Sequence, residues 1–504
     1  MIRESHILLF SIFIAGLCSI IYELLIATTG AYFLGDSITQ FSLTIGIYMA
    51  FMGVGSYLSR WVSDTKLLGS FIGFELILAL IGGMSVPILY FSYAFDLSLQ
   101  LSSVVLTALI GILIGLEIPL LSRLMEKHYN LKTNISNVLS IDYFGALLAT
   151  LLFPFLLLPW LGVFKTSLAF GMMNLTIALA LLWYFAEHLS IARKNVLRLA
   201  LTLVSLILVG TFIFSNELNK IWNNRVYEDH VVHSEQSQYQ QLVLTRSKND
   251  IRLYLNGGLQ FSSIDEYRYH EALVHPAMAR LHQPKQVLLL GGADGLAVRE
   301  LLKYDSIEQV TLVDLDPAVA KLARENHYVK ALNQDSLNST KVDVIHQDGF
   351  VYSAEDKKEY DLILIDLPDP KTISLARLYS KQFYQQLKRR LHPHGLMVTQ
   401  ATSPFFARDA FWSIHNTAVA AGFNRVAPYR VNVPSFGEWG FIMACKHICQ
   451  QPVNHDIESR FYKTELEAML FTIPPDFENQ QQDITTLDNP SVLYYYLKGW
   501  KYWN

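Results

Sequence analysis

The sequence predicts an α-helical membrane domain with several spans, followed by a small β unit and an α/β domain. Two observations divide the chain of 504 residues in this way. Charge is scarce in residues 1–215, which hold ten basic and ten acidic residues and leave 30 and 34 for the rest. Long apolar runs stop near residue 215, and short apolar strands then alternate with helices. The expected domain limits are 1–215, 216–283, 284–450 and 451–504, the last being a C-terminal helical extension.

The first 215 residues contain seven apolar runs of about 20 residues, the length that crosses ~30 Å of hydrocarbon as a helix. Helix is expected because lipid offers backbone amide groups no hydrogen-bond partner. The chain is therefore expected in the cell membrane as a multi-pass protein, with the lipid bilayer as a partner. The runs are Ile7–Thr29, Phe41–Ser59, Leu67–Phe91, Leu99–Leu121, Val138–Pro159, Thr166–Ala186 and Val196–Ser215.

Basic residues between these runs predict how the membrane domain is oriented. They lie before the first run and after the second, fourth and sixth, whereas the other loops hold only Lys165. This pattern places the N-terminus in the cytoplasm, and seven spans would then place the C-terminal part outside. The side of the membrane that carries the C-terminal part stays open, since one span more or fewer would move that part to the other side. The basic residues are Arg3, Arg60, Lys66, Arg123, Lys127, Lys132, Arg193, Lys194 and Arg198.

Four carboxylates interrupt the apolar runs: Glu23, Glu75, Glu117 and Asp142. Charge buried in lipid is costly, so such residues usually face a cavity or a polar partner. One interpretation is a path or site for a cationic substrate. The other is that protonated or hydrogen-bonded carboxyl groups hold the helices together, and the sequence does not decide between the two.

The rest of the chain predicts two kinds of β structure. Residues 231–261 alternate and are rich in β-forming side chains, which predicts a small β unit with a hairpin turn at Ser247–Asp250. A helix is expected over Tyr267–Leu281. After Pro284, apolar strands alternate with helices, and this order predicts a parallel sheet covered on both faces. Ligands of such sheets bind at the carboxyl ends of the strands.

Glycine and acidic residues follow the first three strands of this predicted sheet. Leu288–Gly295 reads LLLGGADG, a strand, a glycine-rich turn and a helix start, as in a Rossmann-like domain. Asp314 ends the next strand at the spacing of a carboxylate that holds a ribose. Asp348 and Gly349 end the third strand and suit an adenine amino group. Together these groups predict a nucleoside site, and the alternative is a turn followed by Asp residues that only cap helices.

Further carboxylates indicate the chemistry of the ligand. Asp294 in the turn would repel phosphate or the carboxylate of S-adenosylmethionine and would attract an amine. The fourth strand ends in DLPDP, which supplies Asp366 and Asp369. This pair suits a diamine, because one carboxylate can hold a distant ammonium while the other accepts a proton from the reacting nitrogen. The alternative is an Asx-Pro turn that merely ends the strand.

The segment from about Tyr239 to Lys446 resembles the spermidine synthase (polyamine aminopropyltransferase) family, and the apolar N-terminal runs resemble its membrane-bound bacterial branch. The motifs that carry the resemblance keep the family's order and spacing. They are YQ at Tyr239, LNGGLQFS at Leu255, DEYRYHE at Asp265, GGADG at Gly291, VDLD at Val313, DG at Asp348, and DLPDP at Asp366 followed by LYSKQFY.

The resemblance implies transfer of the aminopropyl group of decarboxylated S-adenosylmethionine, a co-substrate, to putrescine or a related polyamine. The implied products are spermidine and methylthioadenosine, with Asp366 as general base and a homodimer as the assembly. No metal or other cofactor is implied, since a sulfonium leaves without acid help and the protein mainly supplies alignment. The resemblance assigns Gln240, Asp314, Asp348 and Gly349 to the nucleoside, and His270, Asp294, Gln260, Tyr269 and Asp369 to the amine.

Four positions depart from the family's usual motifs. Ala293 replaces the third glycine of GGGDG, and Asp314 replaces a glutamate. DLPDP replaces the commoner DSSDP, and Val433–Phe441 replaces a segment that usually brings a tyrosine to the amine. These departures leave the identity of the acceptor amine open.

Other signals point to no further site. The net charge of −4 argues against a nucleic-acid partner. Cys445 and Cys449 could indicate a metal site, but no second ligand pair lies nearby in the sequence and a closed zinc site needs four ligands. Two alternative functions remain. One is a methyltransferase-like enzyme, which Asp294 and DLPDP disfavour; the other is a polyamine transporter or sensor, which the retained Asp366 disfavours.

Overall fold

The structure is a computed structural model that describes residues 2–34, 37–95, 97–126, 128–227, 229–454, 457–478 and 482–501. The predicted loop charge Lys127 and the end of the aromatic tail, Tyr502 and Trp503, lie outside these residues. The chain divides into two compact units, Met1–Val231 and Val232–Asn504. This division lies beyond residue 215, because the helix α9 (Ser215–Val226) packs on α4 and α8 of the first unit.

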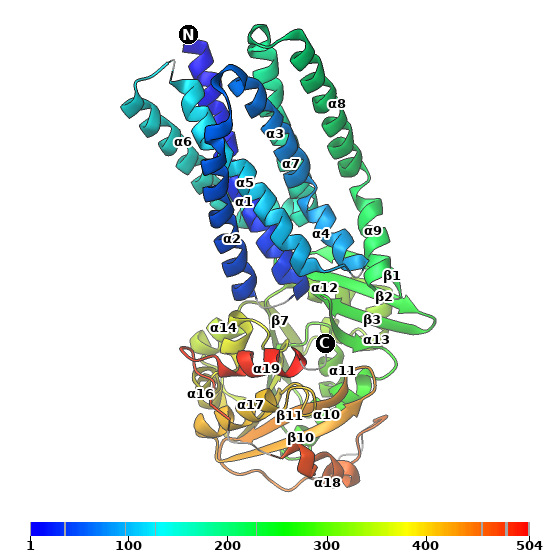
Figure 1. The fold of residues 1–504 in the computed structure, drawn as a ribbon. Coiled ribbons are helices and arrows are strands. Elements are labelled where there is room, and N and C mark those ends of the chain that lie inside the picture. Colours follow the sequence, from blue (N-terminus) through cyan, green and yellow to red (C-terminus); the bar gives the residue numbers. More distant parts are fainter. Residues whose placement is uncertain are drawn as a thin grey trace. The chain divides into compact units, whose positions relative to one another are not determined.

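Among the described residues, the first unit consists of helices and short connections as far as α9 (Figure 1). Three of them begin at a residue whose side chain accepts a hydrogen bond from a backbone N–H of the first turn, namely Ser98, Asn130 and Ser190. The helices are α1 (Ile2–Leu34), α2 (Ser37–Leu58), α3 (Leu67–Gly83), α4 (Ser85–Ala94), α5 (Leu99–Met125), α6 (Leu131–Leu152), α7 (Leu158–Tyr184), α8 (Ile191–Ile213) and α9.

Among the described residues, six helical segments are long and apolar enough to cross a membrane, whereas the sequence predicted seven. The difference lies in Leu131–Tyr184, a single segment of 54 residues. Here α6 continues through a π-helical turn, Phe153–Leu157, into α7, and Pro154 and Pro159 lie in that turn and at the start of α7. The chain is non-helical at Gly162 (φ 68°). Since α6 packs on α1 and α7 on α3, the segment holds two membrane-length stretches.

Small residues and buried carboxylates lie between helices of this unit. A Cβ on Gly55 or Gly115 would collide with the backbone of the facing helix, which confirms that these glycines allow α2 and α5 to approach closely. Glu75 on α3 and Glu117 on α5 are buried, and both oxygens of Glu75 and Oε1 of Glu117 have no hydrogen-bond partner among the described residues. Whether they bind a cation or hold the helices together stays a prediction.

The second unit begins with a four-stranded antiparallel sheet of β1 (His230–Gln236), β2 (Gln241–Ser247), β3 (Asp250–Leu255) and β4 (Gly258–Ser262). Ser247 pairs with Asp250, which confirms the predicted hairpin turn. A second hairpin turn joins β3 and β4. Asn256 (φ 48°) and Gly257 (φ 75°) form a tight turn between them, a conformation that Asn-Gly pairs favour.

The larger sheet has seven strands in the order β10-β11-β9-β8-β5-β6-β7. The strands β5 (Gln286–Gly291), β6 (Gln309–Asp314), β7 (Val342–His346), β8 (Tyr360–Asp366) and β9 (Leu391–Gln400) are parallel, as predicted. The sequence did not predict that β10 (Arg425–Val433) and β11 (Gly437–Cys445) form an antiparallel hairpin at one edge.

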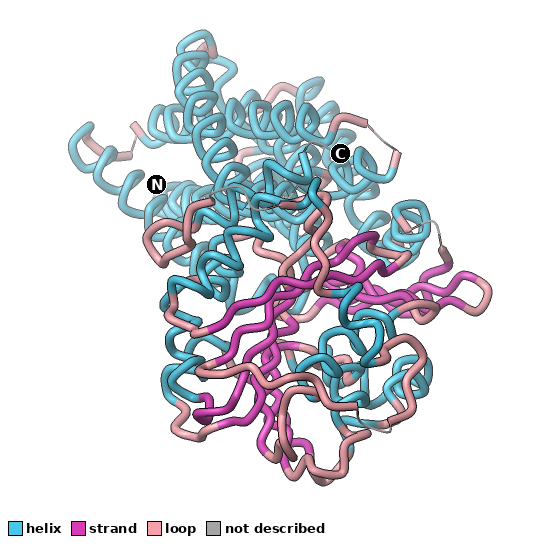
Figure 2. Tube along the Cα trace, turned by 90° about the horizontal axis from the view of Figure 1, so that it is seen from below, coloured by secondary structure: helices cyan, strands magenta, loops and turns pink. Residues whose placement is uncertain are grey.

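Helices cover both faces of this sheet (Figure 2). Alternate residues of β5 are buried in different hydrophobic cores. Val287 and Leu289 belong to the core on one face of the sheet, and Leu288 and Leu290 belong to the core on the other. The helices are α10 (Glu266–Met278), α11 (Leu296–Leu301), α12 (Pro317–Glu325), α13 (His327–Asn333), α14 (Gly349–Glu355), α15 (Ile373–Ala376), α16 (Lys381–Arg390), α17 (Arg408–Ala420), α18 (Glu467–Leu470) and α19 (Ser491–Lys501).

Candidate active site

A cavity of about 510 Å³ lies in the second unit, at the carboxyl ends of β5, β6 and β8. The hairpin of β3 and β4, the helix α10 and the start of β11 complete its wall. The residues assigned from the sequence to catalysis, nucleoside and amine all line this one cavity: Gln240, Gln260, Tyr269, His270, Asp294, Asp314, Asp348, Gly349, Asp366 and Asp369.

The glycine-rich turn after β5 brings the backbone against the neighbouring strand. Gly291 pairs with Asp366 of β8, and a Cβ on Gly291 would collide with the Asp366 carbonyl. Both Gly291 (φ 80°) and Gly292 (φ 72°) adopt the left-handed conformation that favours glycine. Ala293, the departure from GGGDG, is not among the residues with positive φ, so an alanine fits there without strain.

The acidic residues at the strand ends cap local structure and still leave oxygens for a ligand. Oδ1 of Asp294 accepts a hydrogen bond from the Leu296 N–H, and Oδ1 of Asp314 accepts one from the Asp316 N–H, both at 2.9 Å. Burial raises the pKa of Asp294 and of Asp314 to about 6. Each carboxylate has a second oxygen, so the helix-capping and the binding interpretations are compatible.

Asp348 differs because its two oxygens both have protein partners. Oδ1 accepts hydrogen bonds from the backbone N–H groups of Phe350 and Val351, at 2.9 and 3.2 Å, and Oδ2 pairs with the guanidinium of Arg377. Arg377 also lies over the Phe350 ring, 5.5 Å from its centre. A ligand group at Asp348 would therefore share an oxygen that is already bonded.

The two glutamines use their amide nitrogens within the protein. Nε2 of Gln240 donates a hydrogen bond of 3.0 Å to Asp316, whose same oxygen also receives the Ser237 hydroxyl. Nε2 of Gln260 donates one of 3.0 Å to the Gly258 carbonyl. These contacts leave each amide oxygen, an acceptor, as the group that a ligand can use.

Asp366 is the last residue of β8 and lines the cavity. The Tyr269 hydroxyl donates a hydrogen bond of 2.6 Å to its Oδ1. Burial raises the pKa of Asp366, while the nearby His270 and the Tyr269 hydrogen bond act in the opposite direction. A carboxylate with a raised pKa is a better proton acceptor at neutral pH than an exposed one.

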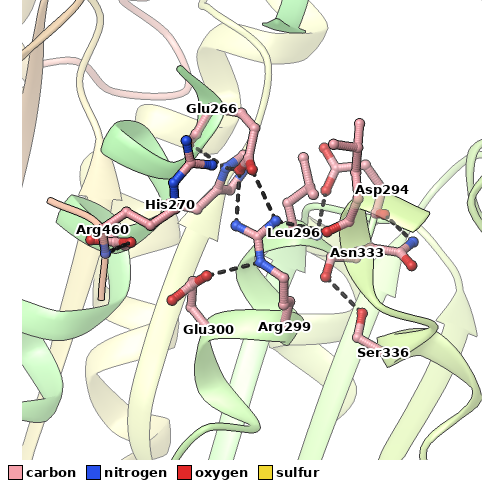
Figure 3. A network of polar contacts seen from close by, with 12 residues as sticks. Glu266, His270, Asp294, Leu296, Arg299, Glu300, Asn333, Ser336 and Arg460 are labelled. Atoms are coloured by element: carbon pink, nitrogen blue, oxygen red, sulfur yellow. Dashed lines mark hydrogen bonds and ion pairs between the residues drawn. The ribbon is translucent and has the colours of Figure 1, made fainter. Parts of the chain in front are cut away.

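His270 belongs to a buried polar network, shown in Figure 3. Its Nδ1 lies 2.9 Å from Oε2 of Glu266, and Arg299 holds both oxygens of Glu266, at 2.9 and 3.0 Å. Burial lowers the pKa of His270, but Glu266, Asp294 and Asp366 outweigh that effect and raise it to about 9. His270 is therefore a cation at neutral pH and offsets part of the negative charge of the cavity.

The structure adds cavity residues that the sequence did not reveal. Phe436 and Trp439, from the segment that departs from the family pattern, lie beside Tyr269 with ring centres 6.4 and 6.5 Å away. Aromatic faces of this kind attract ammonium groups. Lys371 and Gln400 also line the cavity. The signal available in the sequence was a pair of aromatic residues, Phe436 and Trp439, on either side of Gly437.

In two other clusters of chemically reactive side chains, the potential ligand atoms already bond to other groups of the protein. Cys445 and Cys449 form a disulfide, so neither sulfur is a free metal ligand. Glu271, His275 and Glu300 have ligand atoms within 4.8 Å of one another. However, Glu271 accepts hydrogen bonds from three backbone N–H groups of residues 460–462, and His275 bonds Tyr304 and Glu300. These contacts explain the cluster as a structural clamp.

The second unit is a Rossmann-like domain, and its cavity lies at the carboxyl ends of the parallel strands, where ligands of such domains bind. A domain described as the spermine/spermidine synthase domain matches residues 266–454. The chain belongs to the polyamine aminopropyltransferase family, the enzymes that transfer aminopropyl groups.

Three relatives match the chain over nearly its whole length. The polyamine aminopropyltransferase of Leptospira interrogans is 43% identical over 97% of this chain and 98% of its own. Polyamine aminopropyltransferase 2 of Ralstonia nicotianae is 40% identical over 99% of both chains, and the enzyme of Oceanobacillus iheyensis is 39% identical over 99% and 98%.

One solved structure that resembles this chain is a spermidine synthase in complex with the transition-state analogue AdoDATO. It is 26% identical, covers 48% of this chain and 85% of that one, and has a TM-score of 0.45.

Proposed function

We propose that this enzyme transfers the aminopropyl group of decarboxylated S-adenosylmethionine to a diamine such as putrescine, forming spermidine and methylthioadenosine. The observation that supports this best is the hydrogen bond from Tyr269 to Asp366 in a cavity rich in carboxylates. Such a cavity favours a cationic donor and a cationic acceptor over anionic ligands.

In the proposed reaction, the acceptor nitrogen attacks the aminopropyl carbon next to the sulfonium. The carbon–sulfur bond breaks, and sulfur keeps the electron pair as the neutral thioether. An ammonium has no free electron pair, so the reacting nitrogen must lose a proton, and Asp366 accepts it. The sulfonium is a good leaving group, so this chemistry calls on no metal or cofactor.

The proposed binding roles follow the contacts of each residue. The side-chain oxygens of Gln240 and Asp314 accept hydrogen bonds from the ribose hydroxyls, and Asp348 with Gly349 borders the adenine. The amine lies toward Asp294, Asp369, Gln260 and Tyr269. His270 acts on this side by balancing the charge of Asp294 and Asp366. Asp294 disfavours intact S-adenosylmethionine, whose carboxylate it would repel.

We also propose that the helices of the first unit form a membrane domain. Length and apolar composition support this, and so do the close helix contacts at Gly55 and Gly115. The chain should then stay in the membrane pellet after alkaline carbonate and dissolve only in detergent. A chain released by carbonate would contradict the proposal. A homodimer stays a prediction from the family.

A product assay tests the proposed reaction. The full chain in detergent would receive decarboxylated S-adenosylmethionine with putrescine, cadaverine or spermidine in turn, and intact S-adenosylmethionine in a parallel series. Mass spectrometry would follow methylthioadenosine and each polyamine. We expect methylthioadenosine and spermidine in equal amounts with putrescine. Methyl transfer from intact S-adenosylmethionine, or binding without any transfer, would contradict the proposal.

A further inference from the structure

The C-terminal helix α19 supplies a side chain to the amine end of the cavity. The hydroxyl of Tyr496 donates a hydrogen bond of 3.0 Å to Oδ2 of Asp369, which lies 127 residues earlier in the chain. Asp369 is part of the cavity wall. The match to the synthase domain ends at residue 454, so α19 lies outside the part of the chain that defines the family domain. The sequence predicted only that residues 451–504 form a C-terminal helical extension.

The helix α19 is firmly held against α17 of the same unit. Val492 and Leu493 are buried in the core on that face of the sheet. The Trp500 ring stacks on Phe406 at 5.2 Å, with an angle of 27° between the planes. A Cβ on Gly499 would lie 2.8 Å from the Phe406 carbonyl oxygen, so the helix backbone touches its neighbour directly. These contacts fix the position of Tyr496.

Because Tyr496 donates its hydrogen bond to Oδ2 of Asp369, only Oδ1 remains to accept a hydrogen bond from a ligand. Oδ1 is buried and has no hydrogen-bond partner among the described residues, although Gln400 and Thr402 lie beside it. Burying an unpaired carboxylate oxygen is costly, and a bound ammonium would relieve this cost. Because the phenol occupies Oδ2, the carboxylate is restricted in rotation and Oδ1 is held in one direction.

We propose that Tyr496 is a positioning residue that orients Asp369 toward the distal ammonium of a diamine acceptor. The inference rests on the proposed function and specifies its acceptor: the pocket selects an amine with two charged ends over a monoamine of the same length. The reacting nitrogen lies at Asp366, and the second ammonium is bound at Asp369. The helix α19 then contributes a positioning side chain to the acceptor site.

The test compares two acceptors in the full chain, the wild type and Tyr496→Phe. Putrescine has the distal ammonium, and 1-aminobutane lacks it. In the variant, we expect kcat/KM for putrescine to fall about tenfold, mainly through KM, because an interaction with a charged group is weakened. We expect kcat/KM for 1-aminobutane and KM for the donor to change less than about twofold. Tyr494→Phe is the matched control, since Tyr494 is 58% exposed on the same helix.

A second variant separates positioning from a merely structural role. In an Asp369→Asn background, Tyr496→Phe should add little, because both changes remove the same interaction. An equal loss with both amines, or additive effects of the two substitutions, would overturn the inference. Calorimetric binding of putrescine to each protein gives a readout that does not need turnover. Wild-type binding without product would contradict the proposed function alone, whereas equal binding by wild type and Tyr496→Phe would overturn the role of Tyr496.

Discussion

The Tyr269 hydroxyl and Oδ1 of Asp366 lie 2.6 Å apart, and this hydrogen bond tunes the proposed base. A hydrogen bond donated to a carboxylate favours its charged form, so Tyr269 keeps the pKa of Asp366 below the value that burial alone would give. Tyr269→Phe should therefore raise that pKa further.

The expected result for Tyr269→Phe is a shift of the acidic limb of the pH profile of kcat/KM to higher pH. The loss of activity should be larger on the acidic limb than on the plateau, where Asp366 is ionised in both proteins. Steady-state rates at constant ionic strength would measure this. A uniform loss at every pH would mean that Tyr269 acts on binding and not on the base.

The ionised carboxylate of Asp369 should lower the free energy of unfolding of the ligand-free enzyme at neutral pH. Burial raises the pKa of Asp369 to about 6, against the opposing effects of Tyr496 and Lys371. The folded chain therefore holds this proton where the unfolded chain loses it, and stability falls as the pH rises from about 4 to 6. Asp369→Asn should melt about 2–6 °C above the wild type at pH 7 and equal to it at pH 4. A variant that melts below the wild type at pH 7 would contradict this.

His270, in contrast, should raise the free energy of unfolding while its ring is protonated. Its pKa is raised to about 9 by Glu266, Asp294 and Asp366, in spite of burial. The protonated ring therefore stabilises the folded chain below pH 6.5, and this stabilisation is lost as the pH rises through 9. The melting difference between wild type and His270→Gln should shrink steadily between pH 6.5 and 9.5. A difference that is independent of pH would show that the ring acts by packing alone.

The ammonium of Lys371 is expected to compete with the acceptor amine for the negative charge of Asp369. Its ammonium lies in the cavity wall, about 3.5 Å from where a Cβ of Gly258 would be, and it interacts with the charge of Asp369. Burial lowers the pKa of Lys371, and Asp369 partly restores it. Lys371→Met removes a like charge from the path of the incoming diamine, so KM for putrescine should fall severalfold and the difference should narrow at high salt. An increased KM would mean that Lys371 helps to bind the acceptor.

The parts of the site that follow strand ends were predictable from the sequence. Asp294, Asp314, Asp348 and Asp366 each follow an apolar strand, and parallel strands bring such positions to one edge of a sheet. The glycine-rich turn and the hairpin at Ser247–Asp250 were predictable for the same reason, because their conformation depends on neighbouring residues.

Contacts between distant segments were not predictable in this way. Tyr496 reaches Asp369 across 127 residues, and Glu300 reaches His275 across 25. No local pattern records such pairs, since they depend on how helices pack. The antiparallel β10–β11 hairpin was missed because its residues follow strands that are parallel. The fifth and sixth predicted runs are separated by residues 160–165, and the chain becomes non-helical within that gap, at Gly162.

The most direct test of the account measures methylthioadenosine release by the wild type and by Asp366→Asn, with nucleoside binding measured in the same samples. The asparagine keeps the size of the side chain and can still accept the Tyr269 hydrogen bond, but it cannot take a proton. We predict that Asp366→Asn binds methylthioadenosine as tightly as the wild type and that its kcat falls about 10²–10⁴-fold. A variant that transfers the aminopropyl group at the wild-type rate would contradict the account.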